Sequence, residues 1–281
     1  MRGRGDPGEL SASKYVFGTS QTEQQRLVDQ AEWLEPEARW LLDRIGIEQG
    51  WHAADIGCGP IGILNLLSER VGPRGAVIGV EREECFADMA RAQIEKCTLS
   101  NAKIVQADAL GACRECGPFD LVHERLVLIN IAECSQKALV EQMVGLLKPG
   151  GTIALQDYDR VSLLCYPQHP SWTLLMDAYA EAFRLSGGNG STGRSLPWLL
   201  RSAGVRDVKT KVHVRTVDVG DSRRMFVLTM LDVIHDKILA LNRFTEREFA
   251  AHREALSLHL SDPETLLIDR LLVQAWGRKP T

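Results

Sequence analysis

The sequence predicts an α/β protein built on a doubly wound, mostly parallel seven-stranded sheet, with an N-terminal helical lid and a helical cap inserted before the last strand. Three observations predict this fold class. Apolar runs of strand length alternate five times with amphipathic stretches of helix length, which gives parallel strands with helices on both faces. A glycine-rich turn follows the first strand, where such sheets bind ligands. Two further strand-like runs near the C-terminus, separated by helical sequence, favour an antiparallel closing pair.

The N-terminal region divides into two parts. Residues 1–13 are small, polar and glycine-rich, so we expect a flexible segment there. Residues 14–46 are expected to form the lid. Ser20 and Glu23 have the spacing of a capping box that starts an amphipathic helix, and a second helix follows. Residues 47–281 then form the main domain.

Seven strands are expected in the main domain. They cover Ala53–Ile56, Ala76–Val80, Lys103–Ala107, Phe119–His123, Thr152–Gln156, Val208–Val219 and Leu267–Ala275. The helix after the first strand is expected to begin at Pro60, because proline suits a position whose N–H has no intrahelical partner. Glu124 and Arg125 are expected to start the helix after the fourth strand. The cap is the helical sequence at about residues 221–262.

Composition excludes several classes of function. The 281-residue chain has a formal net charge of −4 and no long run of Lys or Arg, so it lacks the basic stripe of a nucleic-acid-binding protein. No apolar run reaches the roughly 20 residues of a membrane helix, and the N-terminus lacks the apolar segment of a signal peptide. We therefore expect a cytoplasmic protein, monomeric or homodimeric, without a membrane partner. The seven cysteines are scattered, and the close pair Cys113 and Cys116 has no second ligand pair at zinc spacing, so no metal is expected.

The turn after the first strand is the most informative part of the sequence. Asp55 closes the strand, and Gly57 and Gly59 follow, so the backbone can approach a ligand without a Cβ in the way. The spacing G-x-G-x-x-G, with Glu81 ending the second strand, also fits a dinucleotide site. Asp55 argues against a dinucleotide, because a carboxylate repels a pyrophosphate but attracts a sulfonium or an ammonium. Asp108, after the third strand, can accept a hydrogen bond from an adenine amine.

An ordered set of motifs resembles the class I S-adenosylmethionine-dependent methyltransferases across most of the predicted parallel sheet. The motifs are Asp55–Gly62, Val80-Glu81, Ala107-Asp108, Phe119-Asp120 and Lys148-Pro149-Gly150-Gly151. The family usually has glycine at the position of Ile61. The resemblance implies a Rossmann-like methyltransferase fold that binds S-adenosylmethionine and releases S-adenosylhomocysteine. It also implies the following contacts: Asp55, Gly57 and Gly59 around the methionyl part, Glu81 on the ribose hydroxyls, Asp108 on the adenine amine, and the Ala109 N–H on a ring nitrogen.

Five further residues are candidates for chemistry or binding. Methyl transfer from a sulfonium needs alignment first, and a base only if the nucleophile carries a proton. His123, ending the fourth strand, is interpreted as a base or acceptor hydrogen-bonder, or else as a structural histidine. Asp157, after the fifth strand, either orients an acceptor or caps a turn. Tyr15 either contacts the cofactor or acceptor from the lid or packs under the first helix. Arg26 and Gln30, one helical turn apart, either reach the cofactor's carboxylate or form a solvated helix face.

The acceptor is expected to be a small molecule enclosed by the lid and the cap. The Asn/Asp-Pro-Pro-aromatic motif of enzymes that methylate adenine or amide nitrogens is absent after the fourth strand. Four segments resemble an actinobacterial-type group of small-molecule methyltransferases, some similar to enzymes that methylate indole C3 of tryptophan-derived cyclodipeptides. These segments are Tyr15–Gly18, His123–Leu126, Gln156–Asp159 and Val273–Pro280. An aromatic secondary metabolite of that kind is the predicted acceptor. O- or N-methylation of another small metabolite, and an NAD-dependent oxidoreductase, are the alternatives.

Overall fold

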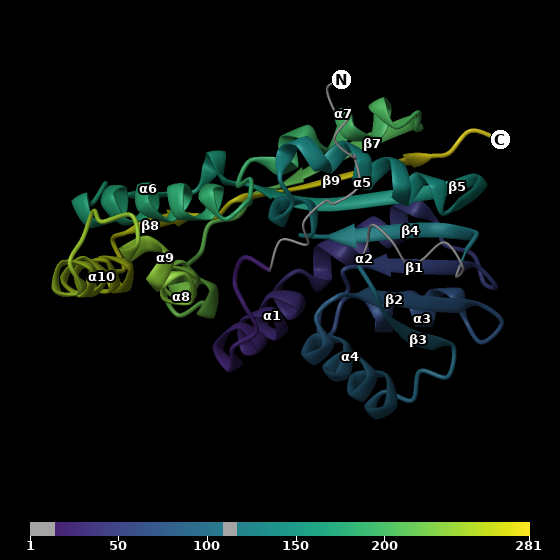
Figure 1. Cartoon of the computed structure of the whole chain (residues 1–281), viewed down its shortest axis with the longest axis horizontal. Coiled ribbons are helices and arrows are strands. Elements are labelled where there is room, and N and C mark those ends of the chain that lie inside the picture. Colours follow the sequence, from purple (N-terminus) through teal and green to yellow (C-terminus); the bar gives the residue numbers. More distant parts are fainter. Residues whose placement is uncertain (1–14, 109–116) are drawn as a thin grey trace, which may run out of the picture.

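The computed structural model describes residues 15–108 and 117–281, and its central feature is a seven-stranded sheet (Figure 1). The strand order is β3-β2-β1-β4-β5-β9-β7. β1 to β5 are parallel to their neighbours, whereas β9 is antiparallel to both β5 and β7. The predicted mostly parallel seven-stranded sheet is therefore confirmed. Its strands are β1 (His52–Ile56), β2 (Ala76–Glu81), β3 (Ala102–Gln106), β4 (Phe119–Arg125), β5 (Leu147–Asp159), β7 (Arg206–His213) and β9 (Leu271–Arg278).

Helices cover both faces of this sheet. Because successive side chains of a strand point to opposite faces, each strand contributes to two cores. Ala53 and Leu121 pack with the helices of one face, and Ile56 and Val122 pack with the helices of the other. The first face is covered by α2 (Glu35–Ile45), α3 (Leu64–Val71) and α4 (Glu84–Lys96), and the second by α5 (Glu133–Gly145) and α7 (Leu196–Ser202). By the same alternation, Asp55 points to the first face.

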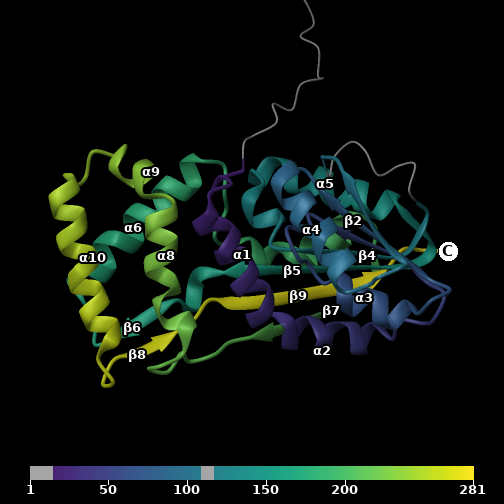
Figure 2. The same ribbon diagram turned by 90° about the horizontal axis from the view of Figure 1, so that it is seen from below.

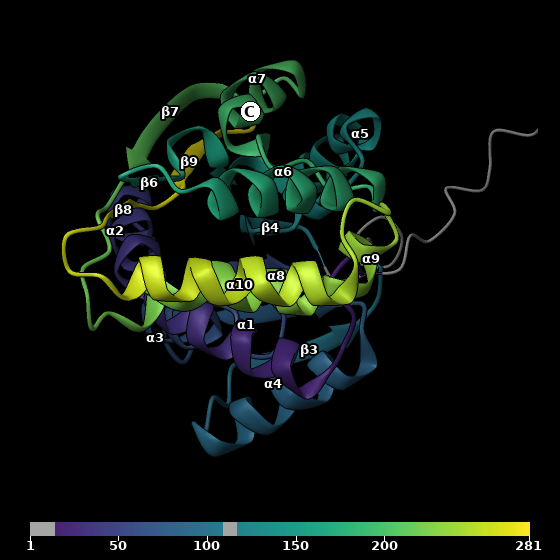
Figure 3. The ribbon, with the colours of Figure 1, turned by 90° about the vertical axis from the view of Figure 1, so that its left-hand side faces the viewer.

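A group of helices forms a cap beyond the carboxyl ends of the parallel strands (Figures 1 and 3). Its helices are α6 (Pro170–Leu185), α8 (Phe226–Val233), α9 (His235–Leu239) and α10 (Glu246–Ser261), joined by a small sheet of β6 (Leu164–Tyr166) and β8 (Leu266–Ile268). They enclose their own apolar core, which includes Leu175, Leu231 and Leu256. The helices α8 to α10 lie between β7 and β9 in the chain, whereas α6 precedes β7. In the described part of the chain, no helix combines the length and the apolar character that crossing a membrane requires.

The N-terminal helix α1 (Gln21–Trp33) lies between the cap and the sheet (Figure 2). Ser20 caps it, because its side chain accepts a hydrogen bond from the Glu23 N–H at 3.2 Å. The Glu23 side chain does not complete the capping box and points inward, where it is fully buried. The first helix thus supplies charged side chains to the interior between the cap and the sheet.

Two boundaries next to the site differ from the sequence prediction. Helix α3 begins at Leu64 and not at Pro60, because Gly62 has a φ of 54°, a left-handed conformation that a right-handed helix excludes. Strand β4 continues to Arg125, whereas the sequence pattern places a helix start at Glu124. The two residues pair instead with β5, Glu124 with Leu155 and Arg125 with Gln156. The longer strand moves His123 back from the edge of the sheet.

Candidate functional site

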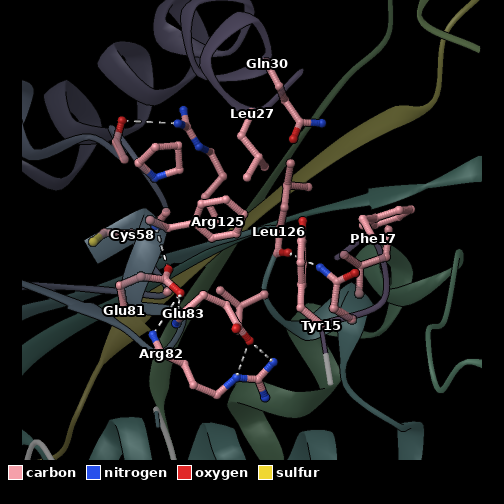
Figure 4. Close-up of a pocket in the computed structure, with 18 of the residues that line it drawn as sticks. Tyr15, Phe17, Leu27, Gln30, Cys58, Glu81, Arg82, Glu83, Arg125 and Leu126 are labelled. Carbon is pink, nitrogen blue, oxygen red and sulfur yellow. Dashed lines mark hydrogen bonds and ion pairs between the residues drawn. The ribbon is translucent and has the colours of Figure 1, made fainter. Parts of the chain in front are cut away.

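A cavity of about 200 Å³ lies at the carboxyl ends of the parallel strands, between the sheet, α1 and the cap (Figure 4). Its walls come from the lid, from the turns after β1, β2 and β3, from the segment after β4, and from α6 and α8. The predicted site residues that line it are Tyr15, Arg26, Gln30, Asp55, Gly57, Gly59, Glu81 and Asp108. His123 and Asp157 are not among its lining residues, and Ala109 lies outside the described residues.

The glycine turn presents bare backbone to the cavity. Gly57 and Gly59 have φ values of 65° and 59°, which favour glycine. A Cβ at Gly57 would lie 2.4 Å from Cγ2 of Val127, so this glycine is required for packing. A Cβ at Gly59 would meet no heavy atom within 4 Å, so it would occupy open space at the cavity wall. The turn therefore fits a ligand that comes close to the Gly59 backbone.

The Glu81 carboxylate ends β2 and binds the glycine turn. Its Oε2 accepts a hydrogen bond from the Gly59 N–H at 2.9 Å, and its Oε1 accepts from the N–H groups of Arg82 and Glu83 at 2.8 and 2.9 Å. Burial raises the pKa of Glu81, and these three hydrogen bonds oppose the rise. Each carboxylate oxygen has two lone pairs, so Oε2 can also accept a ligand hydroxyl. Asp108 lies after the neighbouring strand β3 and lines the same cavity.

Asp55 is bound within the protein on both of its oxygens. Its Oδ2 accepts from the Ile63 N–H at 3.1 Å, and its Oδ1 lies 2.7 Å from Nδ1 of His123. Nε2 of His123 lies 2.6 Å from Nε2 of Gln156, and Oε1 of Gln156 accepts from Nε2 of Gln274 at 2.7 Å. A row of buried polar side chains thus crosses the sheet from β1 through β4 and β5 to β9.

The position predicted for His123 is therefore wrong. The ring is fully buried inside the sheet, and both of its nitrogens already have partners. The physical reason is the length of β4, which carries the edge of the sheet to Arg125. His123 contacts the cavity only through Asp55, so the geometry favours its structural interpretation.

Asp157 lies on the opposite face of the sheet from His123 and is also fully buried. Its oxygens accept hydrogen bonds from the Ile129 and Tyr158 N–H groups at 2.9 and 3.0 Å. Burial raises the pKa of Asp157 to about 8. Glu124, whose Oε2 accepts from the Val127 N–H at 3.1 Å, has its pKa raised by burial and then by the charge of Asp157. The two carboxyl groups accept hydrogen bonds from the segment after β4, and Asp157 does not line the cavity.

The lid carries a buried ion pair that sequence reasoning missed. Glu23 binds Arg26 through two contacts, 2.5 Å to Nε and 2.7 Å to Nη2. It also accepts a hydrogen bond from the Tyr15 hydroxyl at 2.8 Å. Gln30 accepts from Nη1 of Arg26 at 3.3 Å. The predicted residues Tyr15, Arg26 and Gln30 are thus brought together. Glu23, which the sequence pattern marks only as a capping residue, is the common partner of Tyr15 and Arg26.

The end of β4 and the segment after it supply two further lining residues, Arg125 and Asn130. Nη2 of Arg125 donates to the Gly62 carbonyl at 3.3 Å, and Nδ2 of Asn130 donates to the Leu126 carbonyl at 2.8 Å. Nη1 of Arg125 and Oδ1 of Asn130 are buried and have no hydrogen-bond partner in the described chain. The signal for Arg125 is its place directly after an apolar strand, which the predicted helix start concealed.

Aromatic side chains line the cavity on the side where the cap lies. The rings of Phe17 and Phe183 stack with centroids 5.5 Å apart, and Tyr179 stacks on Phe183 at 5.9 Å. Across the cavity, the guanidinium of Arg270 lies 4.1 Å from the ring centroid of Tyr158. These residues come from the lid, α6, β5 and the position just before β9, and contacts between these segments do not follow from local sequence patterns.

Several known proteins with similar sequence or structure are named methyltransferases. A family model described as a methyltransferase domain matches residues 47–204. A demethylmenaquinone methyltransferase of Listeria welshimeri is 26% identical over 133 residues, which are 47% of this chain and 53% of that protein. An uncharacterised methyltransferase of Schizosaccharomyces pombe is 33% identical over 148 residues, 50% of this chain and 52% of that protein. The chain thus spans about half the length of the curated relatives it matches.

Among solved structures, phosphoethanolamine N-methyltransferase 2 of Haemonchus contortus, in complex with S-adenosylmethionine, has a TM-score of 0.57 and 17% identity. The alignment covers 98% of this chain and 61% of that chain. At this identity the likeness shows the fold, which is the Rossmann-like fold of class I methyltransferases. The family model covers more than half of the sequence. The chain belongs to the methyltransferase domain family.

Proposed function

We propose that this chain transfers the methyl group of S-adenosylmethionine to a small-molecule acceptor bound under the lid and the cap. The observation that carries this proposal is the hydrogen bond from the Gly59 N–H to Glu81. It places a buried carboxylate and a bare glycine turn side by side at one cavity wall. An acid that can accept from ribose hydroxyls, next to backbone that admits close contact, suits a nucleoside without a pyrophosphate.

The proposed cofactor contacts follow the strand ends. Asp108 accepts from the adenine amine, the Ala109 N–H donates to a ring nitrogen, and Glu81 accepts from the ribose. Gly57 and Gly59 border the methionyl part, and Asp55 acts there through its charge and by holding the turn. S-adenosylmethionine supplies an electrophilic methyl group on its sulfonium. The protein's contribution is to align the acceptor with that methyl group and to keep water out.

The acceptor that the cavity suits best is a planar aromatic molecule, such as the indole C3 of a tryptophan-derived cyclodipeptide. Phe17, Tyr179 and Phe183 offer flat apolar surface, and the unpartnered Oδ1 of Asn130 can accept from a ring N–H or a hydroxyl. Tyr15 lies at this wall and is proposed to contact the acceptor. One relative is named a demethylmenaquinone methyltransferase. O- or N-methylation of another small metabolite uses the same cavity.

Isothermal titration calorimetry and thermal unfolding test which cofactor the protein binds. S-adenosylhomocysteine is expected to bind and to raise the unfolding temperature by mass action, whereas NAD is not. Stabilisation by NAD and not by S-adenosylhomocysteine would contradict the proposal. The acceptor is tested by transfer of an isotope-labelled methyl group to a tryptophan-derived cyclodipeptide, with phenols and amines as comparisons. Transfer to a phenol or an amine but not to the indole would remove the indole proposal and leave methyl transfer itself in place.

A further inference from the structure

Arg125 differs from the other arginines that line the cavity. Three of them have a carboxylate partner within ion-pair distance: Arg26 pairs with Glu23 at 2.5 Å, Arg82 with Glu83 at 2.9 Å, and Arg270 with Asp269 at 3.1 Å. Arg125 has no such partner in the described part of the chain. Its hydrogen bond goes to a neutral group, the Gly62 carbonyl, at 3.3 Å (Figure 4).

Arg125 is consequently a half-buried cation with an unused hydrogen-bond donor. Its Nη1 is inaccessible to solvent and unbonded. Asp55 is the first of the acids that act on it through space, but both oxygens of Asp55 are bound to Ile63 and His123. Burial lowers the pKa of the Arg125 guanidinium, as desolvation of an unpaired cation requires. Leaving a buried cation unpaired is costly, so an anion in the cavity would gain from contact with it.

The order of the strands indicates which anion reaches Arg125. β3, β2, β1 and β4 are consecutive neighbours in the sheet. Asp108 follows β3, Glu81 ends β2, the glycine turn follows β1, and Arg125 ends β4. If adenine and ribose lie over β3 and β2, as the proposed function requires, the amino-acid end of the cofactor extends over β1 towards β4. That end carries a carboxylate.

We infer that Arg125 binds the α-carboxylate of the amino-acid part of the cofactor, a role that Arg26 does not have. Arg26 is unsuited to it because Glu23 already neutralises its guanidinium through two contacts. Arg125 has an unbonded Nη1 and no carboxylate partner in the described chain, and guanidinium groups of this kind bind carboxylates, often in bidentate geometry. This inference rests on the proposed function, since it takes S-adenosylmethionine as the ligand.

Two ligands that differ in the amino-acid part test the assignment. S-adenosylhomocysteine carries the carboxylate, and 5′-methylthioadenosine has the same nucleoside and thioether without it. Arg125→Gln is expected to weaken S-adenosylhomocysteine binding on the order of ten- to a hundredfold and to leave 5′-methylthioadenosine binding unchanged. Arg125→Lys keeps the positive charge but not the planar guanidinium, so it is expected to lose less affinity for S-adenosylhomocysteine than Arg125→Gln. Arg70→Gln is the matched control, because Arg70 pairs with Asp43 outside the cavity and its loss should change neither affinity.

The unfolding temperature without ligand separates binding from a structural role. Removing an unpaired buried charge is expected to leave the stability of the ligand-free protein unchanged or higher, whereas loss of a structural arginine lowers it. Equal effects of Arg125→Gln on both ligands, or no effect on either, would overturn the inference. The inference would also be overturned if Arg26→Gln, and not Arg125→Gln, lost affinity for S-adenosylhomocysteine but kept its affinity for 5′-methylthioadenosine. If the unchanged protein binds neither ligand, the proposed function itself fails, which is a different result from equal effects in the variant.

Discussion

The imidazole of His123 lies 2.7 Å from the carboxylate of Asp55, one strand away in the sheet. The same carboxylate accepts from the Ile63 N–H, at the point where the glycine turn gives way to α3. His123 is held in turn by Gln156, so the orientation of Asp55 depends on a buried histidine that does not line the cavity. The glycine turn is thus positioned from inside the sheet.

His123→Ala is expected to lower cofactor affinity and the unfolding temperature together. The change leaves Oδ1 of Asp55 and Nε2 of Gln156 without a side-chain partner in a buried site, and unsatisfied buried polar groups cost about 1–3 kcal/mol each. Calorimetry with S-adenosylhomocysteine and thermal unfolding measure the two effects. A large loss of turnover with unchanged affinity and stability would instead assign His123 a direct role in methyl transfer.

Glu81→Ala is expected to weaken the binding of S-adenosylhomocysteine and of 5′-methylthioadenosine to a similar degree, because both ligands carry the ribose. The loss of charge-assisted hydrogen bonds is on the order of 1.5–3 kcal/mol per bond. Glu81→Gln is the milder variant, since an amide oxygen can still accept from the Gly59 N–H. Unchanged affinity in Glu81→Ala, measured by calorimetry, would contradict the placement of the ribose at β2.

The two glycines of the turn are expected to respond differently to alanine. Both substitutions strain a left-handed backbone, by about 1–2 kcal/mol. Gly57→Ala also forces a methyl group against Val127, which adds about 1–3 kcal/mol of overpacking and should appear as a lower unfolding temperature. Gly59→Ala meets open space and should chiefly reduce cofactor affinity. The reverse pattern would show that the ligand does not approach Gly59.

The pair of Asp157 and Glu124 predicts that stability falls with rising pH. Burial raises the pKa of Asp157 to about 8 in the folded protein, against about 4 in an unfolded chain. Between these values the folded state holds a proton that the unfolded chain has released. The stabilising contribution is therefore complete below about pH 4 and is lost as the pH rises to about 8.

Asp157→Asn tests this pH dependence. The amide remains uncharged and its oxygen can still accept from the Ile129 N–H, so the variant should lose less stability than the unchanged protein between pH 5 and pH 8.5. Urea unfolding at the two pH values measures the difference. An identical pH dependence in the variant would show that Asp157 does not hold the proton.

Local patterns were sufficient to predict the first three strands and the acids at or just after their ends. Asp55, Glu81 and Asp108 follow apolar runs of strand length, and parallel strands bring their carboxyl ends to one edge. The contacts between those ends were not predictable, because they depend on how far each strand continues. Two additional residues in β4 place His123 inside the sheet and Arg125 at its edge. Glu23 illustrates the same limit, since its spacing indicates a helix cap and its burial depends on the cap helices that cover it.

The final strand, β9, lies between β5 and β7 and pairs with both. Among the strands that the structure describes, β7 has no second partner in the sheet. As the chain emerges during synthesis, β7 must therefore wait for the whole cap to be made before it can dock. Assembly of this edge of the sheet is therefore coupled in time to assembly of the cap. A chain interrupted within the cap would expose two unpaired strand edges, which promote association with other chains.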